Sequence, residues 1–158
     1  MAQLSWGKPT IEFGECGVNG AAPTTWTKLS CDPVENSTKL TPTKGEKKEA
    51  KVEGGENEAV KYAKNTYAFE FEIRAALGRQ KPIPDVDGVV EGEYAFRLTP
   101  ENTECEGFLI ERATVSVEDT FDTAEGKKWK YTADVLKPAT GNQVKPYLAS
   151  KTPETPQG

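Results

Sequence analysis

Residues 66–76 read TYAFEFEIRAA, and they carry the clearest structural signal in the sequence. Tyr67, Phe69, Phe71 and Ile73 occupy every second position, and polar or small side chains fill most of the positions between them. Four aromatic or branched residues at a period of two are typical of a half-buried β-strand, because an α-helix would scatter them around its axis. The stretch therefore predicts a strand with one face in a core.

Other segments alternate in the same way. We expect strands at Val90–Leu98, Phe108–Asp119 and Lys128–Leu136, and shorter strands at Thr10–Cys16 and Thr25–Cys31. The predicted fold is all-β, a β-sandwich or a strongly curled barrel of about eight mainly antiparallel strands with at most one short helix. A single strand through residues 106–120 would span roughly 50 Å. It must therefore bend with a curled sheet or project from it.

The alternation also predicts which side chains fill the core. Along the second predicted strand Ala95 is expected to face solvent, and along the third Leu109 is expected to face inward. The expected core comprises Phe69, Phe71, Ile73, Tyr94, Phe96, Leu98, Val115, Val117, Trp129 and Tyr131.

Residues 46–53 read EKKEAKVE, and charge pairing decides between a helix and a strand. A helix would stack like charges, such as Lys47 on Lys51, whereas a strand has one face whose charges alternate in sign. The following Gly54 and Gly55 tolerate positive φ and predict a two-residue turn, so residues 46–64 are expected to form a charged hairpin. We expect this hairpin to serve assembly through Lys47, Glu49, Lys51, Glu53, Gly54, Gly55, Val60 and Tyr62.

Turn and proline signals divide the chain into a domain and a tail. The 158 residues suffice for one domain, and residues 1–138 are assigned to it. Residues 139–158 lose the alternation and are rich in proline, which predicts an extended C-terminal arm. Tyr147 and Leu148 are the apolar residues that could anchor this arm.

Composition excludes several functional classes. The chain has no histidine, which removes Ser-His-Asp and Cys-His catalysis and histidine-ligated zinc. Its formal net charge is −5 at pH 7, whereas nucleic-acid-binding domains are usually basic. Motifs for phosphate binding, dinucleotide binding and a serine nucleophile are also missing from the sequence. We therefore expect no enzyme, and no catalytic, metal-binding or cofactor-binding residues.

Two local features could indicate a binding site, but each also has a simpler structural explanation. Residues 85–88, DVDG, resemble the start of a calcium loop, but the later ligands of such a loop do not follow, so a turn is favoured. Trp6, Trp26 and Trp129 could line a sugar-binding platform, although packing in a core or an interface is the simpler role.

Cysteine usage and the N-terminus bear on the compartment. Cys16, Cys31 and Cys105 are widely spaced, and three reduced thiols are favoured over one disulfide with a spare cysteine. The start MAQLSWGKPT lacks the basic and apolar regions of a signal peptide. Together with a mean hydropathy of −0.65, this predicts a chain that is made in a cytoplasm and has no membrane partner.

One longer segment carries a family resemblance. The sequence LTPTKGE at 40–46, continuing to AKVEGGE at 50–56, precedes the aromatic strand that begins at Thr66. This arrangement resembles the tail tube proteins of long-tailed bacteriophages, in particular short prophage-borne versions from gut Bacteroidetes. The later predicted strands and their hairpin also look like the second half of that family. The likeness runs over roughly residues 10–138.

The resemblance implies a β-sandwich or barrel subunit related to the tube-forming proteins of contractile secretion systems. Such subunits form hexameric rings that stack into a tube through which the genome passes. The resemblance therefore implies a virion tail location, partners that are further copies of the chain and other tail proteins, and DNA only as passing cargo. It also implies one helix beside the sandwich and no catalytic residue.

Net negative charge suits such a lumen, because lysines that neutralise phosphates would hold DNA in place. The candidate lumen carboxylates lie on the solvent side of two predicted strands and are Glu70, Glu72, Glu91 and Glu93. Two alternatives stay open: a carbohydrate- or ligand-binding β-sandwich whose tryptophans form the site, and a small structural domain of another kind. A ring former would sediment as hexamers or polydisperse tubes, whereas a binding module would stay monomeric.

Overall fold

The computed structural model describes residues 3–138 and 140–148, and within them it contains β-strands and one 3-10 turn. The all-β prediction is confirmed. The strands are β1 (Thr10–Glu15), β2 (Thr27–Lys28), β3 (Lys39–Thr43), β4 (Lys47–Lys51), β5 (Asn57–Tyr62), β6 (Thr66–Arg74), β7 (Tyr94–Thr99), β8 (Gly107–Asp122), β9 (Gly126–Val135) and β10 (Val144–Tyr147). The 3-10 turn η1 (Val18–Gly20) follows β1, so the helix that the resemblance implies is not found in the described part of the chain.

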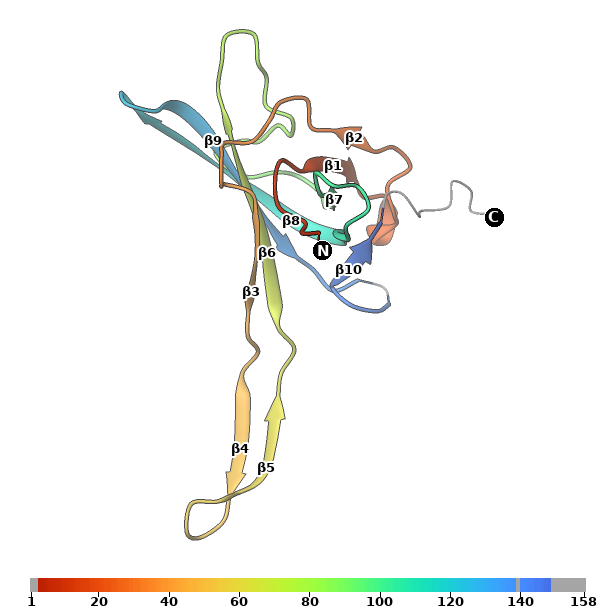
Figure 1. Ribbon diagram of the computed structural model, residues 1–158, viewed down its shortest axis with the longest axis vertical. Coiled ribbons are helices and arrows are strands. Elements are labelled where there is room, and N and C mark those ends of the chain that lie inside the picture. Colours follow the sequence, from red (N-terminus) through yellow and green to blue (C-terminus); the bar gives the residue numbers. More distant parts are fainter. Residues whose placement is uncertain (1–2, 139, 149–158) are drawn as a thin grey trace.

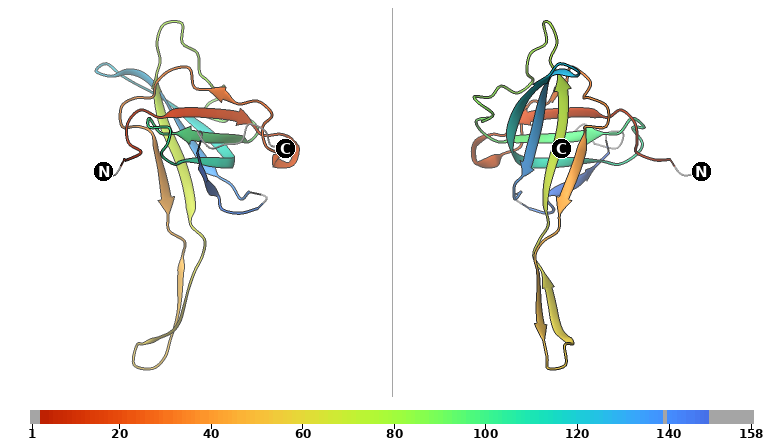
Figure 2. Two further views of the ribbon diagram at one scale, coloured as in Figure 1. Left: turned by 45° about the vertical axis from the view of Figure 1, so that its right-hand side comes forward. Right: turned by 90° about the vertical axis from the view of Figure 1, so that its left-hand side faces the viewer.

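One large antiparallel sheet folds over on itself along β8 (Figure 1). Its strand order is β2-β1-β7-β8-β9-β6-β3, and β10 also pairs with β8, whereas β4 and β5 form a separate two-stranded sheet. The first half of β8 pairs with β7 and β10, and its second half pairs with β9. In the right-hand view of Figure 2, β1 and β7 run across the picture while β3, β6 and β9 run along it. The sheet thus forms two crossing, sandwich-like layers, with β2 and β3 as its end strands.

The hydrophobic core lies between these two layers. Phe71 and Tyr131 stack with ring centroids 5.3 Å apart, and Phe69 meets Phe96 edge-on at 5.6 Å. Tyr94 and Leu98 are only partly buried and pack against the margin of the core. The core prediction is confirmed for Phe69, Phe71, Ile73, Phe96, Val115, Val117, Trp129 and Tyr131.

The expectation that Ala95 faces solvent was wrong. The register of β7 against β8 shifts between Tyr94 and Phe96, which is the mark of a β-bulge. The extra residue lies on β8, where three steps from Ala113 to Ile110 face two steps on β7, so β7 keeps its alternation and Ala95 stays on the face away from Phe96. Ala95 is nevertheless buried, with an exposure of 1%, because it pairs with Gly14, over which Pro23 and Thr25 pack closely. The strand also begins at Tyr94, so the buried Val90 reaches the core from the preceding loop.

The expectation that Leu109 faces the core was also wrong, because the bulge adds its extra residue to β8. Ile110 and Ala113 are both fully buried, so the inward phase of β8 changes between them. A bulge bends the strand that carries it, and this one lies where β8 passes from one layer to the other. The long strand expected through residues 106–120 therefore bends with the sheet.

Two strands were not expected from the sequence. β3 and β10 each contain a proline, Pro42 and Pro146, and each lies at an edge of the sheet. Proline removes a ladder donor and is tolerated at edges. Residues 144–147, which were assigned to an extended arm, thus belong to the main sheet. The last part of that predicted arm, residues 149–158, lies outside the described residues.

Candidate functional site

A ribbon made of β4 and β5 projects from the sandwich beyond the ends of β3 and β6 (Figure 1). The hairpin predicted at residues 46–64 is confirmed. Every residue of both strands is exposed, so neither face of the ribbon is covered. A two-stranded hairpin with no covering layer is only marginally stable in water. Among the described elements, the ribbon is therefore the one with the least support from the rest of the fold.

The base of the ribbon is tied to the sandwich by backbone contacts. The Gly45 N–H donates to Asn65 Oδ1 over 2.9 Å, and the Ala63 N–H donates to the Glu46 carbonyl over 2.8 Å. A Cβ at Gly45 would collide with the Ala63 carbonyl group, so this close approach requires glycine. The ribbon thus continues the β3–β6 pair.

One face of the ribbon combines apolar and paired charged side chains. Tyr62 lies opposite Lys47, and Val60 lies opposite Glu49. Lys47 Nζ is 2.9 Å from Glu49 Oε2, and this lysine lowers the pKa of the Glu49 carboxyl below its ordinary value. Lys44 Nζ lies 4.8 Å from the centroid of the Tyr62 ring. This face therefore presents the apolar side chains Val60 and Tyr62 beside one carboxylate, Glu49, which Lys47 and Lys51 both contact.

The other face of the ribbon is basic. Lys48 lies directly opposite Lys61, and Ala50 lies opposite Ala59. The two small side chains leave the aliphatic stems and ammonium groups of the lysines as the main features of this face. The pairing of Lys48 with Lys61 was not predictable from the sequence, because strand alternation does not tell which residues of two strands are opposed.

The turn of the ribbon differs from the prediction. The Gly55 N–H donates to the Val52 carbonyl over 3.0 Å, so Glu53 and Gly54 are the central turn residues, not Gly54 and Gly55. A register shift between Ala50 and Lys51 leaves Glu58 of β5 as an extra residue without a partner in β4. Glu53 belongs to the turn, because β4 ends at Lys51, and it does not continue the charge alternation of that strand. Both glycines do have positive φ, as expected.

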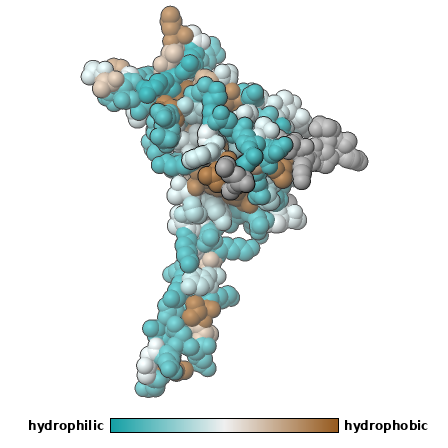
Figure 3. All heavy atoms as spheres, in the orientation of Figure 1, coloured by the Kyte–Doolittle hydropathy of each residue, from teal (hydrophilic) through white to brown (hydrophobic). Residues whose placement is uncertain are grey.

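Apolar side chains are also exposed at the opposite end of the molecule. Leu77 follows β6 and is fully exposed, and Phe121 near the end of β8 is 70% exposed. β6 begins at Thr66 beside the ribbon and ends at Arg74, so its length separates the two ends. Figure 3 shows hydrophobic atoms at the tip opposite the ribbon, and a few on the ribbon itself.

The candidate lumen carboxylates Glu70 and Glu72 lie on the outer face of β6. Lys130 Nζ is 3.7 Å from Glu70 Oε1, and Lys128 Nζ is 3.6 Å from Glu72 Oε1. We count the charges on this outer face along the cross-strand rows in which β6 pairs with β9, with their continuations into β3 and β8. These rows hold equal numbers of cations and anions. These are Lys39, Arg74, Lys128 and Lys130 with Glu70, Glu72, Glu118 and Asp134. The face is therefore polar and charge-balanced, not a bare row of carboxylates.

The other two candidates lie elsewhere in the fold. Glu93 immediately precedes β7, and Arg112 contacts both of its carboxylate oxygens at 2.9 and 2.8 Å. This guanidinium lowers the pKa of Glu93. Glu91 is exposed in the loop before it. The structure thus brings Glu70 and Glu72 together but does not bring Glu91 and Glu93 to the same face.

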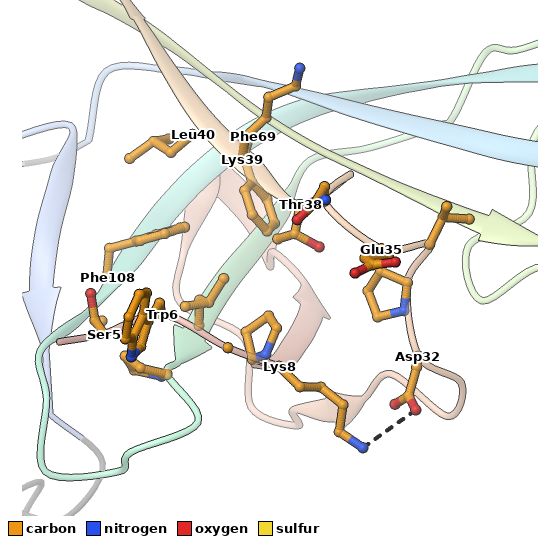
Figure 4. Close-up of a pocket in the computed structure, with 18 of the residues that line it drawn as sticks. Ser5, Trp6, Lys8, Asp32, Glu35, Thr38, Lys39, Leu40, Phe69 and Phe108 are labelled. Carbon is orange, nitrogen blue, oxygen red and sulfur yellow. Dashed lines mark hydrogen bonds and ion pairs between the residues drawn. The ribbon is translucent and has the colours of Figure 1, made fainter.

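A groove of about 700 Å³ opens between the two layers on one side of the sandwich (Figure 4). Phe69 and Phe108 line its floor, with ring centroids 5.3 Å apart, and Trp6 lies across its mouth with 76% of its surface exposed. Lys8 and Asp32 form an exposed ion pair at one side, with 3.4 Å between Nζ and Oδ2. Sequence reasoning missed this groove because residues distant in the chain form it.

The three tryptophans do not form one platform. Trp6 lies at the groove, and Arg97 covers the ring of Trp26 with its guanidinium carbon 4.3 Å from the centroid. Trp129 is buried, and Lys81 Nζ lies 5.9 Å from its ring. The DVDG segment forms a turn, in which the Gly88 N–H donates to Asp85 Oδ2 over 2.7 Å.

Within residues 3–138 and 140–148, no group of three or more acidic or cysteine side chains could hold a metal ion. Cys16, Cys31 and Cys105 are free thiols. None of the described elements is a helix long and apolar enough to cross a membrane. The fold thus defines an all-β, sandwich-like protein with a projecting ribbon. No known family model matches the chain, and no curated protein matches its sequence.

Proposed function

We propose that this chain is a structural subunit of a phage or prophage tail tube, which assembles with copies of itself into rings that stack into a DNA-conducting tube. The observation that carries the proposal is the ribbon, whose residues are all exposed and whose two faces lack any covering layer. An element of this kind gains its stability from a second molecule. A hexameric ring follows from the resemblance of the sequence to tail tube proteins.

The distribution of exposed apolar side chains supports end-to-end association. The ribbon exposes Val52, Val60 and Tyr62, and the far end exposes Leu77 and Phe121. Two different apolar surfaces at opposite ends of one subunit suit a heterologous, head-to-tail contact, which repeats along an axis instead of closing into a dimer. Stacked rings in which the ribbon of one copy reaches the next would use both ends.

The charge-balanced outer face supports a wall along which DNA can pass. Each of Lys128 and Lys130 lies beside a carboxylate, Glu72 and Glu70. Lysines that are already neutralised release fewer counterions on contact with phosphates, so they bind DNA weakly. In the tail the other partners are further tail proteins, and DNA is cargo.

The alternative is a carbohydrate-binding module that uses the tryptophans. The groove beside Trp6 is the feature that favours it. However, the platform of three tryptophans is not formed, because Trp26 stacks with Arg97 and Trp129 is buried in the core. The geometry therefore favours assembly.

Sedimentation velocity over a range of protein concentrations tests the proposal. The full chain is expected to form hexamers or larger, polydisperse species as concentration rises. In a matched variant, residues 47–62 are replaced by Asn-Gly, a two-residue turn that can join Glu46 to Ala63, which are already hydrogen-bonded neighbours. This variant should fold and stay monomeric. A full chain that stays monomeric at every concentration would contradict the proposal.

A further inference from the structure

The groove between the layers has the composition of a site for an extended, proline-rich peptide. Besides Trp6 and Phe108, its walls contain Pro9, Pro33 and Pro100. Aromatic-lined grooves bind polyproline II segments, because that conformation is preformed and loses little entropy on binding. Trp6 is mostly exposed at the groove mouth, so a ligand in the groove could bury its indole ring.

The chain itself carries such a segment, and it leaves the sheet at the groove. In the β10–β8 pair, Tyr147 lies opposite Gly107, and Gly107 and its neighbour Glu106 line the groove. The ten residues that follow Leu148 read ASKTPETPQG and contain a Pro-x-x-Pro spacing. At about 3.1 Å per residue in polyproline II, these residues reach about 30 Å. This length is ample to cross the groove from its rim.

The groove walls carry carboxylates that could pair with the lysine of this segment. Glu35 and Glu106 line the groove, and within the described residues neither carboxylate forms an ion pair. Lys151 precedes Pro153 by two residues. Glu106 stands at the rim where the chain leaves β10, so it is the first carboxylate that this lysine meets.

We propose that residues 151–156 of the same molecule bind in this groove as a polyproline II segment, with Pro153 and Pro156 against Trp6 and Phe108 and with Lys151 paired to Glu106. The proposal does not depend on the tail tube function. It assigns the groove to an internal peptide, and it gives the exposed Trp6 a partner.

NMR of the full-length chain tests the proposal through the Trp6 indole N–H resonance, which is assigned by its loss in Trp6→Phe. We expect Pro153→Ala with Pro156→Ala to move this resonance, whereas the matched control Thr152→Ala with Thr155→Ala should leave it in place. A synthetic ASKTPETPQG peptide added to the proline variant should return the resonance saturably to its original position. Lys151→Glu should move it as well, and the charge swap Lys151→Glu with Glu106→Lys should restore it.

Several results would overturn the assignment. One is a Trp6 resonance that is the same in all of these chains and insensitive to the peptide. Another is a resonance that moves to the variant position when the full chain is diluted tenfold, because the occupant would then be a second copy. A shift caused by oligosaccharides but not by the peptide would assign the groove to a sugar. A charge swap that fails to restore the resonance would contradict the pairing of Lys151 with Glu106.

Discussion

Lys48 and Lys61 lie directly opposite each other across the β4–β5 ribbon, and both are exposed. Like charges at opposed positions destabilise an antiparallel pair, and no layer beneath the ribbon compensates for this repulsion. The ribbon therefore carries a local electrostatic strain in the isolated subunit. An anionic group on a partner surface would relieve it.

The first prediction concerns this lysine pair. Lys48→Glu replaces a repulsion with an opposite-charge pair, which should stabilise the ribbon by about 0.2–1 kcal/mol. Amide hydrogen exchange of residues 47–62 in the monomer should become slower. Lys48→Gln removes the repulsion without adding an attraction, so its exchange should be intermediate. Equal exchange in all three chains would show that the opposed lysines do not destabilise the ribbon.

The second prediction concerns the hydroxyl of Tyr131. This buried group donates to the Ile83 carbonyl over 2.9 Å and accepts from the Ile83 N–H over 3.4 Å. Tyr131→Phe leaves both backbone groups without their partner, so it should lower the free energy of unfolding by about 1–3 kcal/mol. Tyr67→Phe on the neighbouring strand β6 is the control and should change it by less than about 0.5 kcal/mol. Chemical denaturation measures both values, and an unchanged Tyr131→Phe midpoint would be inconsistent with the bond.

The third prediction is a pH dependence from the same side chain. Burial raises the pKa of Tyr131 to about 12, from an ordinary value of 10.0. The unfolded chain therefore loses this proton at lower pH than the native chain. The stability that Tyr131 contributes is complete below pH 10 and is lost as the pH rises toward 12, by about 1.4 kcal/mol for each pH unit.

Because lysines titrate in the same range, the measurement is a difference between two chains. The free energy of unfolding should fall more steeply between pH 10 and pH 12 in the natural chain than in Tyr131→Phe. Parallel curves for the two chains would show that Tyr131 ionises equally in the native and unfolded states.

Strands with one face in the core carry a strong local signal in the sequence. β6 and β9 were predictable because each has one face in the core, so Phe69, Phe71 and Tyr131 recur at a period of two. The ribbon was predictable from its alternating charges and its glycines. In these elements local sequence and tertiary environment agree.

The missed features depend on contacts between distant segments. β3 and β10 are short edge strands with a proline each, so they carry no alternation, and their pairing is set by β6 and β8. The bulge beside Ala95 interrupts the period of two where the sheet must bend. The groove at Trp6 exists only once the N-terminal segment meets Phe108. None of these has a strong local signal.

The fourth prediction concerns the charge-balanced face. Glu70→Lys with Glu72→Lys should still fold, because both side chains lie on the outer face, but it converts four cations and four anions into six and two. Tubes made of this variant should retain DNA, with binding that weakens steeply as salt is added. Glu70→Gln with Glu72→Gln is the control with a smaller excess of positive charge and should retain less. Tubes that release DNA equally in all three forms would show that this face does not line the lumen.

Electron microscopy of the concentrated, purified chain shows whether the chain assembles and whether assembly needs the ribbon. We expect rings or tubes for the full chain, and only dispersed monomers for the chain in which Asn-Gly replaces residues 47–62. Circular dichroism of that variant must show a folded β-sheet, because every core residue lies outside the ribbon. Rings or tubes that form equally well without the ribbon, or a full chain that forms neither at any concentration, would contradict the account.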